Sequence, residues 1–344
     1  MKFDIFTPDY GIMPSAYFQR STITNPMELF WSDDLLALLH LCGAKEEMIG
    51  ERASDYDRFL SLSYALPLLE GHPTRAWIAS VLEKHFGLQE LPTEANAPAV
   101  WKMLCENLLE KPLSSKELVS GAWLCDGLTV PSILPDNITP VLDANLLLQT
   151  QAKTATAWSA EITATVAHFA ARGCQKIVLH LANGFDFVSP SLYNVDRALS
   201  LTKRGREASN LLTCQLMREL CITAQEHGLL LVLVGEDNSV AVARLLYYAE
   251  ESVGLPRICW SIREAREALP LLDFTAKQPH KNEIFAALQY KSVMTQNELF
   301  DAIESWQVRY PVGKLTYLTA RDLRQMPCAQ AHIADMLKKT KIKI

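Results

Sequence analysis

The chain has 344 residues, a length that suits one large α/β domain or two smaller ones. Hydrophobic residues make up 49% and charged residues 21%, and the formal net charge is −6, with a pI of about 5.8. This balance excludes an overall basic field that would hold nucleic acid or an anionic membrane, so neither is expected as a partner.

The cysteines and the apolar runs bear on the compartment. Eight cysteines are scattered without a Cys-x-x-Cys pair, and several stand in apolar runs, which is typical of reduced, buried thiols. The N-terminus lacks the apolar run of a signal peptide, and no 18 consecutive residues are apolar. The sequence therefore predicts a cytoplasmic protein with no membrane span.

The first third of the chain is expected to be helical. Asn25 is a suitable N-cap, Pro26 suits the first helical position and Glu28 follows three residues after the cap, so one helix is predicted from there to Gly43. Apolar periodicity and flanking proline and glycine residues predict three further helices, at 54–69, 73–87 and 97–110.

From about residue 120, short apolar runs alternate with helical patterns. Six strands are predicted, at 122–125, 140–142, 176–181, 229–234, 257–260 and 313–318. Helices are predicted between some of them, at 158–172, 206–226 and 239–252. Strand–helix–strand spacing of this kind indicates parallel βαβ units. With weaker strands near "FDIF" and "LLDFT", the count would reach eight.

These elements predict an α/β fold, a (β/α)8 TIM-like barrel, complete or incomplete, with an added N-terminal helical region. A doubly wound open sheet is the alternative. We expect residues 1–118 to hold the N-terminal strand and the helical region, and residues 119–344 to hold the barrel portion, packed as one compact unit.

Motifs with a defined chemistry are absent from the sequence. There is no Gly-x-Gly-x-x-Gly, no phosphate loop, no nucleophile elbow, no His-x-His and no His-Glu-x-x-His. The two histidines that stand closest are twelve residues apart. A metal site could arise only from ligands on distant strands.

The polar residues at predicted strand ends are the candidates for a site. His180, at the end of "KIVLH", is a possible ligand or acid–base group, although a hydrogen-bonded core histidine is favoured about three to one. Asp126 and Asp143 directly follow strands, where barrel catalytic groups lie, but both also suit turns or helix caps. Asn183 and Thr316 complete the expected polar lining.

Glu236 and Asp237 follow the apolar run 229–234 and precede the helix predicted at 239–252. They could serve as a catalytic base. Acidic residues are also favoured at a helix N-terminus without any catalytic role, and capping is the better interpretation here.

Residues 29–88 resemble the N-terminal helical region of the uronate (glucuronate) isomerase family, of the amidohydrolase superfamily. The resemblance rests on a set of short motifs: Cys42-Gly43-Ala44-Lys45-Glu46, Ser54-Asp55-Tyr56 with Phe59, Gly71-His72-Pro73, and Phe86-Gly87. Weaker similarity continues in "FAARGCQKIVLH", "GLLLVLVGEDN" and "YPVGKLTYL".

The resemblance implies a barrel that uses a divalent metal such as zinc to interconvert an aldose uronate and a ketose uronate, for example D-glucuronate and D-fructuronate. Such chemistry moves a proton between neighbouring carbons, with a metal or acid on the oxygens, a base at the carbon and cations for the substrate carboxylate.

The residues that the family uses for this chemistry are not found at the matching positions. No histidine occurs in residues 1–39, so the first-strand His-x-His is absent. The fifth-strand histidine falls at or beside Leu233, and the last-strand Thr-Asp falls at Thr316-Tyr317. His180 matches a fourth-strand histidine to within one residue, and no arginine clamp for a carboxylate is evident.

The favoured hypothesis is a degenerate, metal-free paralogue that binds a small sugar acid, needs no cofactor and does not isomerise uronates. One alternative is an active aldose–ketose isomerase with a rebuilt site, in which Glu236 or Asp237 is the base and His180 the acid. Another is a structural or regulatory partner. An oligomer is compatible with each of these hypotheses, and the sequence does not decide whether the protein is an enzyme.

Overall fold

Eight parallel strands form the centre of the computed structural model, which describes residues 11–12, 22–30, 33–70, 72–114, 121–132, 134–235, 239–262, 284–290 and 315–319. The strands are β1 (Gly11–Ile12), β2 (Gly121–Leu124), β3 (Ile138–Asp143), β4 (Lys176–His180), β5 (Leu230–Val234), β6 (Arg257–Ile262), β7 (Ile284–Tyr290) and β8 (Leu315–Thr319). Each strand pairs with the next along the chain.

The strand order β1 to β8 without reversal is the order of a (β/α)8 barrel, and it excludes the doubly wound alternative, in which the order changes direction at a switch point. Helices α8 (Ala155–Ala171), α9 (Leu192–Ser200), α10 (Arg206–His227) and α11 (Ser239–Val253) lie between β3 and β6 in the chain. Within the described strands β8 does not pair with β1, so the barrel is incomplete.

The six strands predicted from apolar runs are all present as β2 to β6 and β8. The sequence did not identify β1, which has only two residues, or β7, whose run "IFAALQY" was not singled out. The expected weak strands at 3–6 and 271–275 lie outside the described residues.

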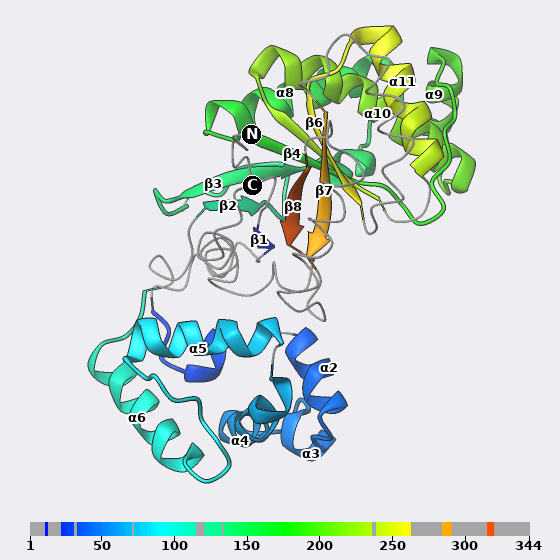
Figure 1. Ribbon diagram of the computed structural model, residues 1–344. Coiled ribbons are helices and arrows are strands. Elements are labelled where there is room, and N and C mark those ends of the chain that lie inside the picture. Colours follow the sequence, from blue (N-terminus) through cyan, green and yellow to red (C-terminus); the bar gives the residue numbers. More distant parts are fainter. Residues whose placement is uncertain are drawn as a thin grey trace.

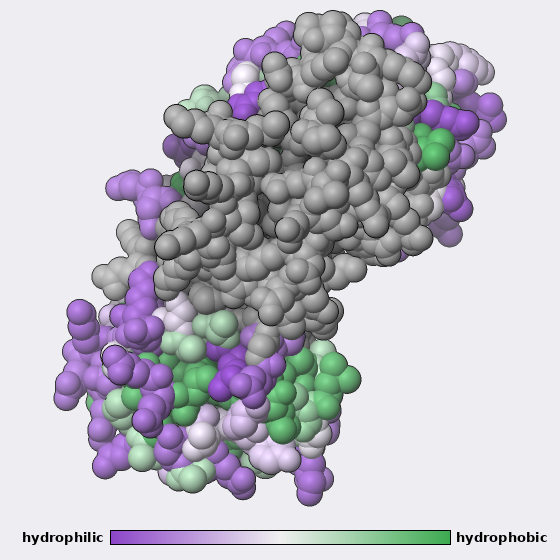
Figure 2. Space-filling view, in the orientation of Figure 1, coloured by the Kyte–Doolittle hydropathy of each residue, from purple (hydrophilic) through white to green (hydrophobic). Residues whose placement is uncertain are grey.

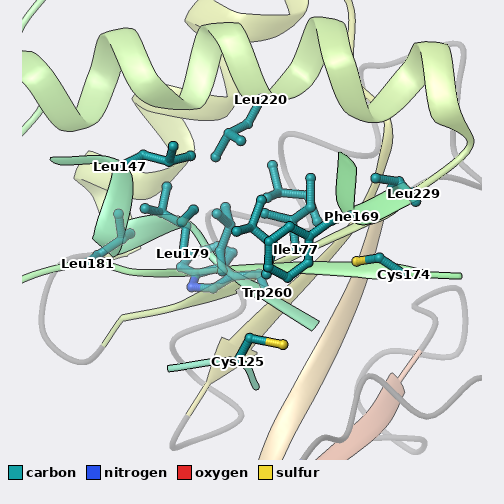
Figure 3. Packing of buried hydrophobic residues seen from close by; sticks show 14 of the residues in the cluster. Cys125, Leu147, Phe169, Cys174, Ile177, Leu179, Leu181, Leu220, Leu229 and Trp260 are labelled. Atoms are coloured by element: carbon teal, nitrogen blue, oxygen red, sulfur yellow. The ribbon is translucent and has the colours of Figure 1, made fainter. Parts of the chain in front are cut away.

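The sheet has two chemically similar but separate apolar faces. On β4, Ile177 and Leu179 belong to the large cluster that includes Leu220 of α10, and in Figure 3 they lie between the sheet and that helix. Val178, between them, belongs to a second cluster with Val232 and Cys259 on the opposite, inner face. Successive residues along a strand therefore point alternately to the helices and to the barrel interior, as in any pleated strand.

The N-terminal helices are inserted between β1 and β2, and Figure 1 shows them gathered beneath these strands. They are η1 (Pro26–Leu29), α2 (Asp33–Leu41), α3 (Glu46–Ile49), α4 (Asp55–Ala65), η2 (Leu66–Leu69), α5 (Pro73–Phe86) and α6 (Ala97–Glu110). An antiparallel bridge joins the two ends of this insertion, where the amide of Ile23 donates to the carbonyl of Leu113 over 2.8 Å.

Local capping explains where several of these helices begin and end. The Asn25 side chain accepts from the amide of Met27, as an N-cap should, but only a 3-10 turn follows. The prediction of one helix up to Gly43 was therefore wrong, because α2 begins separately at Asp33. Ser54 forms a capping box with Asp57 at the start of α4.

Part of the insertion's surface is apolar. Figure 2 shows hydrophobic residues gathered on the visible face of the helical region, and its exposed large side chains include Leu41, Tyr64, Leu68 and Leu109. Within the described part of the chain, no helix has both the length and the apolar character needed to cross a membrane. The proposed division at residue 118 lies in 115–120, which the structure does not describe, and stays a prediction.

Candidate functional site

The carboxyl ends of parallel strands are where barrel proteins place their chemistry. Here the register joins one row of residues across five strands, and we call this row the His180 level. It consists of His180, Val234, Ser261, Ala287 and Thr316, each paired with the next. Thr316, predicted as a lining residue, therefore lies at the same level of the sheet as His180.

The side chains of His180, Val234 and Ser261 lie on the inner face, because they alternate with the helix-facing residues of their strands. Ser261 is fully buried and Val234 is 7% exposed, whereas His180 is half-buried. His180 is thus an inner-face residue at the open end of its strand. Whether His180 acts as a ligand, as an acid–base group or only as a hydrogen-bonded core histidine stays a prediction.

Asn145 fixes the main chain at His180. Its Nδ2 donates to the carbonyl of His180 over 2.7 Å, and its Oδ1 accepts from the amide of His180, also over 2.7 Å. The side-chain amide therefore acts as one further peptide group of β3, placed beside the last residue of β4. Sequence reasoning missed Asn145, although an asparagine two residues past a strand end is a recognisable signal of such a role.

Asp143 serves as a helix cap. It ends β3, and its Oδ1 accepts from the amide of Asn145 over 2.9 Å at the start of the 3-10 helix η3 (Ala144–Gln149). Of the two interpretations of Asp143, the structure supports capping. This bond also orients Asn145, so Asp143 acts on His180 through that asparagine.

The remaining predicted site residues are less closely joined to His180. Asp126 is exposed in the segment after β2, and Asn183 is exposed in the loop after β4. Glu236 and Asp237 lie outside the described residues. The last described residue before them, Gly235, comes so close to β4 that a Cβ there would lie 3.2 Å from Leu181. The end of β5 and the loop after β4 are therefore in contact.

The inner face of β5 does not offer a metal ligand. Leu233 is fully buried in the cluster that faces the helices, so the expected ligand cannot fall on Leu233 itself. The inner-face positions on either side of it are Val232 and Val234, and both are aliphatic. Among the described residues, no group of three or more His, Cys, Asp or Glu side chains is placed to hold a metal ion. These residues do not fit the divalent metal of the uronate isomerase family.

The buried thiols near the site are not reactive at neutral pH. Burial raises the pKa of Cys125, just after β2, to about 11, and burial also raises the pKa of Cys259 on the inner face. Both thiols therefore stay protonated at neutral pH, where nucleophilic attack requires a thiolate. Neither thiol is a candidate nucleophile.

Two arginines that sequence reasoning did not identify lie at the same end of the sheet. Arg204 Nη1 donates to the carbonyl of Leu148 over 2.6 Å, and Arg206 Nη2 donates to the carbonyl of Gly184. Leu148 belongs to η3, which follows β3, and Gly184 lies in the loop after β4. Their position in the sequence could have identified them, because they lie at the start of the helix that leads into β5. In a parallel βαβ unit this start lies at the carboxyl ends of the strands.

The protein belongs to the class of (β/α)8 barrels. Its parallel strands follow in sequential order, and a helical insertion separates the first two. Its fold is that of solved uronate isomerases. The uronate isomerase of Thermotoga maritima aligns with a TM-score of 0.71 at 14% identity, over 98% of this chain and 90% of that one. The glucuronate isomerase of Caulobacter crescentus aligns with the same TM-score at 10% identity, over 98% and 86%.

Sequence comparison finds similarity to the same group of enzymes over one part of the chain. Residues 27–123 match the glucuronate isomerase family model, so this segment of the chain is similar to that family. Uronate isomerases of Streptococcus uberis and Caldicellulosiruptor bescii are 30% and 26% identical, over 120 and 108 residues. These matches cover 34% and 31% of this chain, but only 26% and 23% of the relatives' own length.

The residues that carry this match build the insertion. Asp55 accepts from Nδ2 of Asn25 and from Nη1 of Arg58, and so ties the start of α4 to the η1 turn. Tyr56 and Phe59 pack their rings against Trp101 of α6. The matched motifs therefore account for the packing of the helical region, and the chemistry of the barrel is a separate question.

Proposed function

We propose that this chain is a uronate-isomerase-like protein that has lost the metal-dependent isomerisation of its family and binds a small sugar acid at the carboxyl ends of its strands. The observation that carries the proposal is the pair Val232 and Val234. They occupy the inner face of β5, where the resemblance places a metal ligand, and Val234 lies directly beside His180.

The chemistry of the family reaction supports this proposal. Moving a proton between neighbouring carbons requires an electrophile on the carbonyl and hydroxyl oxygens together with a base at the carbon. On the inner face at the His180 level, the described side chains are one imidazole, one isopropyl group and one buried hydroxyl. The half-buried imidazole of His180 is the one of these groups that can reach an oxygen of a sugar acid by a hydrogen bond.

A second candidate is an isomerase with a rebuilt, metal-free site. The half-buried position of His180 on the inner face, with its main chain fixed by Asn145, favours this candidate. In it, His180 would be the acid and Glu236 or Asp237 the base. A third possibility, a structural or regulatory role beside another cytoplasmic protein, would be recognised by co-purification from cells.

Metal analysis together with an isomerase assay tests the proposal. The purified protein is analysed for zinc and manganese and is then assayed with D-glucuronate and D-galacturonate, with and without Zn²⁺ or Mn²⁺. We expect metal far below one equivalent and no turnover above that of His180→Ala. Stoichiometric metal, or turnover that His180→Ala abolishes, would overturn the proposal in favour of an active isomerase.

A further inference from the structure

The segment between α9 and α10 carries a concentration of positive charge, with Lys203, Arg204 and Arg206 in four residues. Helix α10 leads directly into the amino end of β5, so its own first residues lie at the carboxyl ends of the strands. We infer that Arg204 and Arg206 form the anion-binding side of the candidate site and hold the carboxylate of the sugar acid. The choice of a sugar acid as the anion rests on the proposed function.

Arg204 is fixed to the short helix η3, which follows β3. Its side chain is half-buried, and Nη1 donates to the carbonyl of Leu148 over 2.6 Å. Leu148 is three residues past Asn145, in the same short helix η3. One guanidinium edge is thereby anchored on the element that also holds His180, while four of its five N–H groups remain for other acceptors.

Arg206 is fixed over the end of β4 in a comparable way. Its Nη2 donates to the carbonyl of Gly184, which lies four residues past His180. Gly184 has φ +68°, and a Cβ built there would lie only 2.5 Å from that nitrogen. The left-handed φ favours glycine at this position, and a methyl group there would push the guanidinium away from the carbonyl.

The charge of the two arginines is not neutralised within the described part of the chain. The ion pairs found there join other residues: His40 with Glu46, Arg58 with Asp55, Lys102 with Glu106, and Arg218 with Glu219. The acceptors that Arg204 and Arg206 contact by these hydrogen bonds are both carbonyl oxygens. A planar guanidinium with free donors matches the two oxygens of a carboxylate in a fork-to-fork geometry. The pair thus offers the arginine clamp that the sequence did not reveal.

Binding measurements with matched variants test the inference. Isothermal titration with D-glucuronate, D-galacturonate and neutral D-glucose is carried out on the wild type, Arg204→Ala, Arg206→Ala and the double variant. Arg197→Ala, an exposed arginine on α9, is the control. We expect each of the first two variants to bind the uronates about tenfold more weakly and the control to change by less than twofold. Thermal melts confirm that each variant is folded.

A second variant keeps the inference testable if an arginine variant does not fold. Gly184→Ala places a methyl group where the Arg206 guanidinium lies, and it should reproduce the Arg206→Ala effect with every charge retained. Uronate binding that is equal in wild type, arginine variants and control would overturn the inference, as would a wild type that binds no uronate. Equal binding by all the variants would overturn only the inference about the arginines. A wild type that binds no uronate would also count against the sugar-acid binding in the proposed function, but not against the absence of isomerisation. Turnover in the metal and isomerase tests would instead overturn the proposed function. In that case the inference about the arginines would be tested by the KM for the uronate, which should rise in the arginine variants.

Discussion

Asn145 is the residue on which the geometry at His180 most depends. Its side chain forms hydrogen bonds with both the amide and the carbonyl of His180, the last residue of β4. Replacing it leaves two main-chain groups without these bonds. Leaving a buried polar group unsatisfied costs more than a typical hydrogen bond contributes.

We therefore expect Asn145→Ala to lower the free energy of unfolding by about 2 to 3 kcal/mol, measured by urea denaturation. Asn183→Ala is the control, because Asn183 is exposed in the loop after β4 and should change the same quantity by less than about 0.5 kcal/mol. Equal effects of the two substitutions would show that the Asn145 bonds do not hold the strand end.

Cys214 of α10 gives the stability of the protein a defined pH dependence. Burial raises the pKa of its thiol from 9.0 to about 11, although the amide of Val188, 3.5 Å from the sulfur, lowers it in part. The unfolded thiol ionises near pH 9 and the folded thiol near pH 11. The stabilisation is therefore complete below pH 9 and is lost as the pH rises toward 11.

Between pH 8 and pH 10 this one group should remove about 1.3 kcal/mol from the free energy of unfolding. Other thiols and tyrosines titrate in the same range, so the quantity to measure is a difference. The fall from pH 8 to pH 10 should be smaller in Cys214→Ala than in the wild type by about this amount. Parallel pH profiles for the two proteins would contradict the assignment.

At the scale of elements, β5 shows what alternation along a strand can and cannot reveal. The run "LLLVLV" is apolar at every position, so its sequence gives a buried strand but no indication of which residues face inward. The register with β4 and β6 decides this, and it places Leu233 against the helices and Val234 beside His180. A ligand expected at or beside Leu233 must therefore be sought at Val232 or Val234.

This assignment predicts that a histidine lowers the free energy of unfolding more at position 233 than at position 234. Leu233→His would bury an imidazole in the packed layer between sheet and helices, and we expect a loss of about 4 kcal/mol in the free energy of unfolding. Val234→His would lie at the open end of the inner face and should cost about 1 to 2 kcal/mol. Urea denaturation compares the two, and the reverse order would mean that the strand faces the other way.

The helices were predictable for reasons that the strands were not. Helix α6 has the bounds Ala97–Glu110 that its periodicity predicts, and α5 ends at Gly87, whose φ of +69° suits a left-handed cap. Strand β1 has only two residues and is defined by its pairing with β2, a tertiary contact. The same limit applies to the site, because Asn145, Arg204 and Arg206 are joined to the strand ends only through hydrogen bonds between segments distant in sequence.

At the scale of the whole molecule, the barrel and the insertion relate differently to the uronate isomerases. The fold aligns over 98% of the chain with 14% identity or less, whereas the family match in sequence is confined to residues 27–123. Nearly all of that segment is the helical insertion. The barrel part of the chain therefore shares its architecture with these enzymes at low sequence identity.

The proposed loss of the family's metal site predicts a protein that does not depend on a metal for stability. We expect dialysis against EDTA to leave the thermal midpoint unchanged within about 1 °C, and added Zn²⁺ to raise it by no more than that. A ligand that binds only the folded state must raise its stability, so a drop in the midpoint after EDTA would reveal a bound ion. Dialysis without chelator is the control.

The bridge between Ile23 and Leu113 means that the insertion leaves the barrel and returns to it at a single point. A segment attached in this way can accept or resist substitutions almost independently of the strands that carry it. Such an attachment allows substitutions in the barrel interior that leave the packing of the helices unchanged. Most of the sequence match to the uronate isomerases lies in this insertion, so a search for the protein's physiological role can begin from the surface of its helices as well as from the ends of the strands.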